Sequence, residues 1–211
     1  MREELKYLDI EGHYGGDQEW FSYFSMRFGG CAAATACELL LYHALYREGC
    51  RALYPYDIGR PTKADFNLLG KRMRPYLKPR AGGISRLSTY TEGLSCYLRE
   101  ETGGKFRLEA ESLGGDAPEE EAEAFVREGI RRGIPMPFLL LRHQDPQFSE
   151  ITWHWFLLTG YEESEEGLRV VYGTYGERYT ALLSSLWDTG HEQKGGILRL
   201  CIRPAHGEAA G

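Results

Sequence analysis

A cysteine that follows two glycines has a setting that favours nucleophilic chemistry. Cys31 opens a run of strong helix formers that extends to Leu45. A thiol at a helix N-terminus lies beside unpaired backbone N–H groups and the positive end of the helix dipole, and both favour the thiolate. The same N–H groups can stabilise a developing oxyanion. Cys31 is therefore a candidate nucleophile, and the alternative is a small buried side chain at a closely packed helix start.

The second candidate is a histidine within an apolar segment. Residues 151–161 read ITWHWFLLTGY, and His154 is the one side chain there that titrates near neutral pH. A nearly continuous apolar run predicts a central strand covered on both faces. A buried histidine needs partners for its ring nitrogens, so His154 is either a satisfied core residue or a functional base. Paired with Cys31, it would form a thiolate–imidazolium pair that attacks a carbonyl carbon.

Three short motifs in this order resemble the papain-like cysteine peptidase superfamily. They are FGGCAAA at 28–34, HW at 154–155 and GTYG at 173–176. The resemblance is strongest to the bacterial branch that includes the bacteriocin-leader (double-glycine) peptidases. It implies a papain-like fold in which Cys31 is the nucleophile and His154 the general base. The implied reaction is hydrolysis of a peptide or amide bond through a thioester.

Two positions depart from the pattern of that superfamily. The Asn or Asp that orients the histidine would fall on Gly173, which has no side chain, so Thr174 or a backbone carbonyl would have to replace it. The oxyanion glutamine would fall on Ser25, and the nearest glutamine is Gln18, which a longer loop would have to return to the site. Because loss of the orienting acid from a serine-type triad costs about 10⁴ in rate, the alternative is an inactive protein that binds a peptide in this cleft.

A third function, cysteine-dependent acyl transfer, ranks last. Arylamine acetyltransferases and transglutaminases place an aspartate soon after the histidine, whereas the next aspartate here is Asp188. Glu38 follows Cys31 by two helical turns, and we expect it to form a salt bridge or to be solvated. Three aromatic residues near the motifs either shield the cysteine and histidine from water or belong to the core: Trp153, Trp155 and Tyr175.

The composition suits a single domain of 211 residues with no nucleic-acid partner, because the net charge is −6. No apolar run approaches the ~20 residues of a membrane span, and the charged N-terminus lacks the apolar region of a signal peptide. The five cysteines contain no CxxC pair, which predicts neither a metal site nor a disulfide framework and suits a reducing cytoplasm. We expect no cofactor and a peptide or protein substrate, and the oligomeric state stays open.

Hydrophobic periodicity predicts helices first and strands second. Helices are expected over 31–47 with one buried face, over 62–76 with a capping box from Thr62 to Asp65, and over 87–99 and 118–133. Strands are expected over 105–111, 136–142, 151–161, 167–174, 177–182 and 196–203, with one helical turn at 184–187. Residues 1–30 are expected to be irregular. The fold class is therefore α+β, with N-terminal helices packed on one face of a C-terminal antiparallel sheet.

Overall fold

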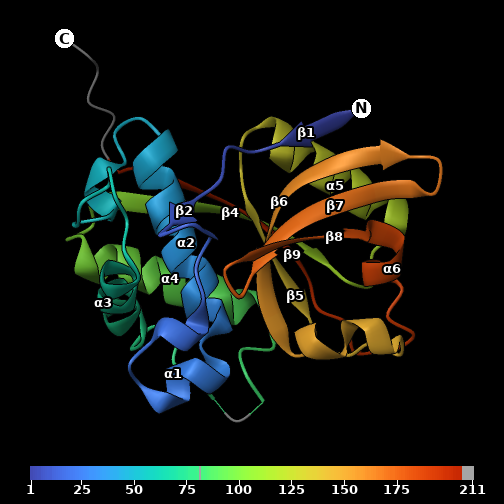
Figure 1. Cartoon of the computed structure of the whole chain (residues 1–211), viewed down its shortest axis with the longest axis horizontal. Helices are drawn as coiled ribbons and strands as arrows, with labels where there is room; N and C mark the ends of the chain where they lie inside the picture. Colours follow the sequence, from blue (N-terminus) through green and yellow to red (C-terminus); the bar gives the residue numbers. More distant parts are fainter. Residues whose placement is uncertain (81, 206–211) are drawn as a thin grey trace.

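One antiparallel sheet runs through the molecule and carries helices on both faces (Figure 1). The structure is a computed structural model, and it describes residues 1–80 and 82–205. Seven strands form the sheet in the order β4–β9–β5–β6–β7–β8, and β1 pairs with the far end of β6. Their bounds are β1 Arg2–Glu4, β4 Phe106–Gly114, β5 Met136–Leu140, β6 His154–Ser164, β7 Gly167–Thr174, β8 Glu177–Leu182 and β9 Gly196–Pro204.

The helices divide into two groups, one on each face of the sheet. Figure 1 shows α1, α3 and α4 to the left of β5, and α5 and α6 to its right. On the first side lie α1 (Phe24–Gly29), α2 (Cys31–Tyr46), α3 (Lys63–Met73) and α4 (Leu87–Glu101), and on the second lie α5 (Glu119–Arg131) and α6 (Leu183–Trp187). The α+β class is confirmed, but the prediction that helices cover one face is wrong.

Alternation along β6 explains why both faces are covered. Trp155 and Leu157 belong to the core that includes α2, α3 and α4. Phe156 and Leu158 belong to the opposite core, with α5 and α6. Because successive side chains of a strand point to opposite faces, an uninterrupted apolar strand needs a cover on each side. The apolar run at 151–161 thus predicted a central strand correctly.

The predicted elements match the observed ones most closely in the second half of the chain. The bounds of β7 and β8 are as predicted, while residues up to Ile151 form a 3₁₀ helix, η3 (Pro146–Ile151), and not the start of β6. Thr62 caps α3 by accepting a hydrogen bond from the N–H of Asp65 at 3.1 Å. Residues 1–30 are more ordered than predicted, since they contain β1, β2 (Asp9–Ile10), β3 (His13–Tyr14), η1 (Gln18–Trp20) and α1.

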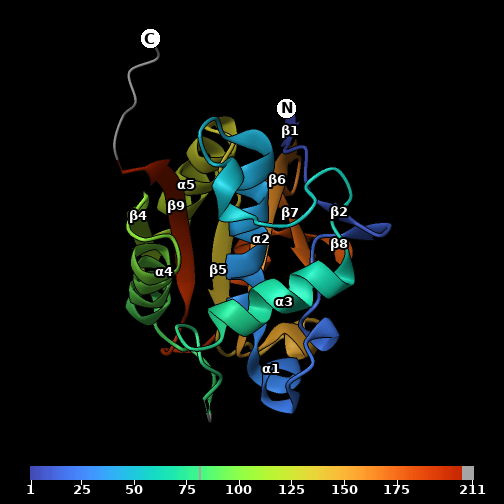
Figure 2. The same ribbon diagram turned by 90° about the vertical axis from the view of Figure 1, so that its left-hand side faces the viewer.

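Helix α2 is buried all round, and not on one face as its sequence pattern suggested. Every residue from 31 to 44 is buried. Figure 2 shows α2 in the middle of the helical layer, with α3 and α4 nearby and the sheet behind it. Alanines at 32, 33, 34 and 36 have the small side chains that let neighbours approach closely from all sides. None of the described helices is long and apolar enough to cross a lipid bilayer.

The short junction between α1 and α2 fixes where Cys31 lies. Gly30 is the only residue between the two helices, and its carbonyl accepts the first hydrogen bond of α2, from Ala34 at 2.8 Å. A Cβ at position 30 would lie 2.2 Å from the carbonyl oxygen of Met26. Because that oxygen belongs to the backbone, a side chain at position 30 would force the helices apart.

We therefore expect Gly30→Ala to destabilise the protein by about 1–3 kcal/mol, the usual cost of overpacking. Gly29→Ala is the matched control, because its Cβ would make an ordinary contact of 3.4 Å with Pro79. Urea unfolding of both variants measures the difference. Equal stabilities for the two variants would contradict the tight junction.

Candidate active site

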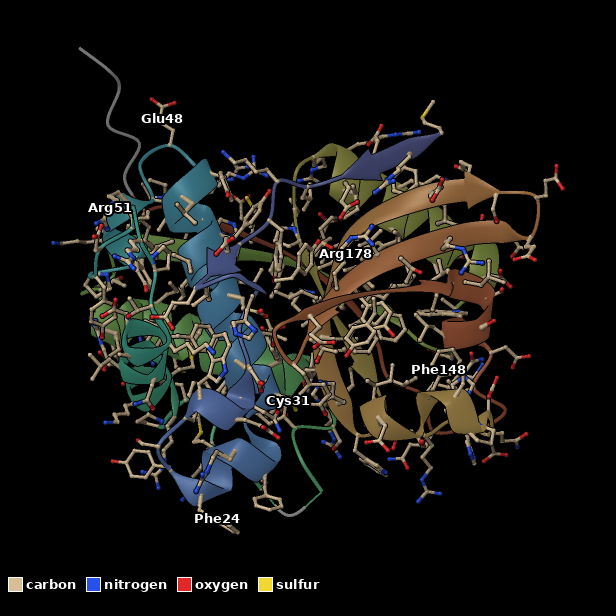
Figure 3. The ribbon with its side chains drawn as sticks, viewed as in Figure 1. Phe24, Cys31, Glu48, Arg51, Phe148 and Arg178 are labelled. Atoms are coloured by element: carbon tan, nitrogen blue, oxygen red, sulfur yellow. The ribbon has the colours of Figure 1, made fainter. Side chains whose placement is uncertain are left out.

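Residues from four separate segments meet at one small pocket beside the N-terminus of α2. Cys31 of α2, His154 of β6, Thr174 of β7 and Gln18 of η1 all line it. Figure 3 places Cys31 where the helical layer meets the sheet. The sequence named these four residues, and the structure brings them together. Their chemical roles remain predictions.

The ring of His154 is hydrogen-bonded to Thr174. Its Nε2 atom lies 2.7 Å from the hydroxyl oxygen of Thr174, and its ring stacks on Tyr175 with centroids 4.8 Å apart. A Cβ at Gly173, the other candidate for orienting the histidine, would instead meet the rings of Tyr14 and Tyr7, at 3.2 and 3.3 Å. A side chain at position 173 would therefore meet these two tyrosine rings first.

Burial keeps both Cys31 and His154 neutral in the resting protein. Desolvation raises the pKa of the Cys31 thiol, although nearby backbone N–H groups of Trp155 and Ala32 act in the opposite direction. Desolvation also lowers the pKa of His154 from 6.5 to about 4. Among the described residues no hydrogen bond joins the two side chains. The prediction that the helix end holds Cys31 as a thiolate is therefore wrong for the resting state.

The start of α2 still offers donors for an oxyanion. The first N–H groups of a helix have no acceptor within it. Within the described part of the chain, Ala34 donates to Gly30, and no backbone carbonyl is paired with the N–H of Cys31 or Ala32. Donors of this kind stabilise negative charge that develops on a carbonyl oxygen beside them.

Gln18 lines the pocket and contacts α1. The resemblance to papain-like enzymes would place the oxyanion glutamine at Ser25, which is exposed on α1. The side-chain N–H of Gln18 donates to the carbonyl of Arg27 at 2.7 Å, which fixes the orientation of the amide. Its amide oxygen is buried without a partner in the described part of the chain. One N–H of the same amide remains for another acceptor.

The three aromatic residues around His154 differ in burial and in backbone conformation. Trp155 is core, since its ring lies 4.5 Å from that of Tyr90 and its N–H donates to Ile84 at 2.7 Å. Trp153 is 40% exposed and has a φ of 53°, and Tyr175 has a φ of 52°. A positive φ is rare for bulky residues and tends to occur at functional sites. Nothing in the residue types at these two positions indicates a positive φ.

The environment of Glu38, which also lines the pocket, differs from the one predicted from the sequence. Glu38 is 2% exposed, and it is neither solvated nor part of a salt bridge within the described residues. Burial raises its pKa from 4.5 to about 8.

In residues 1–80 and 82–205, no group of three or more His, Cys, Asp or Glu side chains is arranged to hold a metal ion.

Comparisons with protein-family models, curated proteins and solved structures gave no match to this chain. The site is therefore interpreted from its own geometry.

The ring of His154 should titrate near pH 4 in the folded protein, and NMR of the histidine ring protons measures this. The folded imidazole stays neutral while the unfolded chain takes up a proton below its ordinary pKa of 6.5, so the contribution of His154 to the free energy of unfolding should fall as the pH drops from 6.5 to about 4. His43, buried with the same shift, adds a second contribution of this kind.

His154→Gln identifies the resonance, and the difference between its pH dependence and that of the unaltered protein isolates the contribution of His154 from those of His43 and Glu38, which have opposite signs. A His154 ring that titrates above pH 6.5 would contradict the neutral resting state and indicate a thiolate–imidazolium pair.

Proposed function

We propose that this protein is a papain-like cysteine hydrolase that acts on a peptide or amide bond. The observation that carries the proposal is the shared pocket. It is lined by a cysteine at a helix start and by a histidine whose Nε2 is hydrogen-bonded to Thr174. Cys31 is the nucleophile, His154 is the general base, and Thr174 is the positioning residue. Gln18 and the first N–H groups of α2 are the oxyanion donors.

Because Cys31 and His154 are both neutral before the reaction, the thiol proton of Cys31 must move to His154 during the attack. With Nε2–H donated to Thr174, the Nδ1 atom of His154 is the one free to accept a proton. It takes the thiol proton as the sulfur of Cys31 bonds to the substrate carbonyl carbon. The carbonyl π electrons move to the oxygen, and the N–H groups of Cys31 and Ala32 stabilise that oxyanion.

The second half of the cycle returns the enzyme to its resting state. The imidazolium of His154 gives its proton to the leaving amine as the C–N bond breaks, which leaves a thioester on Cys31. A water then loses a proton to His154 and attacks the thioester carbon. The carboxylic acid leaves, and the thiol and the neutral imidazole are restored.

A catalytically inactive, peptide-binding protein is the second candidate. Two observations favour it: the thiol and the imidazole are both desolvated and neutral, and the amide oxygen of Gln18 lies buried without a partner within the described residues. Acyl transfer has less support, because Asp188 lines a different pocket, with Glu119 and His143. Measured cleavage of a peptide distinguishes a hydrolase from a protein that only binds peptides.

We expect Cys31→Ala to abolish cleavage of a peptide library, because no other group in the pocket can form the thioester. Mass spectrometry of the reaction products measures the cleavage, and an added mass on Cys31 after rapid acid quench reports the acyl-enzyme. Cys96→Ser, a change at a half-exposed cysteine of α4, is the matched control and should cleave at the original rate. Peptide binding without turnover in the unaltered protein would instead support the second candidate.

Thr174→Val should lower kcat by roughly 10²-fold, less than the about 10⁴ for a charged orienting acid, because a hydroxyl adds no charge to the imidazolium. The side chain keeps its shape but no longer accepts the proton on Nε2 of His154. Thr174→Ser restores the hydroxyl and should restore most of the rate. If the valine variant matched the serine variant in kcat, Thr174 would not be a positioning residue.

A further inference from the structure

The carboxyl of Glu38 joins the segment before Gln18 to helix α2. It accepts a hydrogen bond of 2.5 Å from the N–H of Gly16. A Cβ at Gly15 would lie 2.3 Å from the carboxyl oxygen, and one at Gly16 would lie 2.2 Å from the ring of Phe66. The two glycines therefore allow the backbone to lie close to Glu38 and Phe66, and both glycines are buried.

The same peptide segment also holds the turn after β7. The carbonyl of Gly16 accepts from the N–H of Gly176 at 3.0 Å, and the carbonyl of Gly176 accepts from Tyr14 at 2.9 Å. Gly176 follows Thr174 and Tyr175 directly, and these two residues contact His154. One short chain of hydrogen bonds thus runs from α2 through Gly16 to the turn that orients the histidine.

The backbone of Glu38 lies two helical turns from that of Cys31. It follows Cys31 by seven residues on the same helix, which corresponds to about 10 Å along the axis. Both residues line the pocket, Cys31 at the helix end and Glu38 two turns further along. Its contribution to the site is therefore to position other groups.

Within residues 1–80 and 82–205, no cationic side chain forms an ion pair with Glu38. The titratable groups that face it or share its pocket carry no fixed positive charge: Tyr7, Asp17, Cys31, Cys37, Tyr90, His154 and Tyr175. The Tyr7 hydroxyl is close enough to act on the carboxyl but is not in hydrogen-bonding geometry. A buried carboxyl without a cation keeps its proton. The raised pKa of Glu38, about 8, is consistent with this arrangement.

We propose that Glu38 is a positioning residue that, in its protonated form, holds the Gln18 segment and the turn at Gly176 against α2. Opening of the site exposes the carboxyl to water, where it loses its proton. Rising pH therefore favours the open site, and the closed, competent arrangement is most populated at and below neutral pH. The effect of pH on catalysis rests on the proposed function, whereas the role of Glu38 in holding the two segments against α2 does not.

The test is hydrogen–deuterium exchange of the full chain, read by mass spectrometry on peptides that cover 14–20 and 173–178. The closed site keeps a proton that the open site releases, so the opening constant should rise by about tenfold per pH unit between pH 4.5 and about 8. Exchange is measured at pH 6 and pH 7, after correction for the intrinsic pH dependence of amide exchange. We expect protection in both segments to fall by about tenfold between these pH values.

Three variants decide the outcome. Glu38→Gln keeps an acceptor oxygen for Gly16 but cannot ionise, so its protection should be the same at both pH values. Glu38→Ala leaves the Gly16 N–H without an acceptor and should lose protection in both segments at both pH values. Glu48→Gln, at an exposed position just beyond the C-terminal end of α2 that Figure 3 labels, should behave like the unaltered protein.

Glu38→Gln with the pH dependence of the unaltered protein would overturn the proposal, even if Glu38→Ala does not fold. Normal protection in Glu38→Ala would also overturn it. Hydrogen–deuterium exchange does not depend on catalysis. If the protein cleaves no peptide, the proposed function is refuted, but the exchange of the Glu38 variants still tests the positioning role of Glu38. Where cleavage is present, Glu38→Gln should shift the alkaline loss of kcat/KM to higher pH.

Discussion

The burial of α2 on every side is the constraint on which the rest of the site depends. The helix lies between β6 and the other helices of its layer, and fourteen of its sixteen residues are buried. Its position is set by close contacts, such as the hydroxyl pair Thr35–Tyr90 at 3.1 Å and the ring contact of Tyr90 with Trp155. A central helix of this kind brings its first residue, Cys31, directly to the sheet, and it removes that residue from water at the same time.

Desolvation then outweighs the helix dipole in setting the charge of the thiol. A favourable charge at a helix end contributes about 0.3–1 kcal/mol at exposed sites, whereas full burial shifts pKa values by up to several units at about 1.4 kcal/mol each. The direction of the shift at Cys31 is the expected result of that difference. The helix start at Cys31 was predicted correctly, but the charge of its thiol was not, because the sequence does not show how deeply a helix start is buried.

Much of the fold followed from local patterns, and the misses came from tertiary contacts. The strand at 167–174, the cap at Thr62 and the apolar strand around His154 depend on alternation, capping and composition within a few residues. The choice of Thr174 over Gly173 depends on which face of β7 each residue occupies, which is fixed by strand pairing. The burial of Glu38 depends on a segment more than twenty residues earlier in the chain, and no periodicity within the helix reveals that contact.

The site is assembled from neutral hydrogen bonds, in contrast to the surface. Ion pairs such as Arg178–Glu4 at 2.7 Å lie at the periphery, where salt screens them and each contributes little. In the site, Gln18 is held by a carbonyl, His154 by a hydroxyl and Gly16 by a carboxyl that keeps its proton. Salt weakens hydrogen bonds between uncharged groups only a little. Each buried titratable group, however, changes the stability of the site when it gains or loses a proton. The arrangement should therefore tolerate changes in ionic strength and respond to pH, because protonation, and not charge pairing, is what holds it closed.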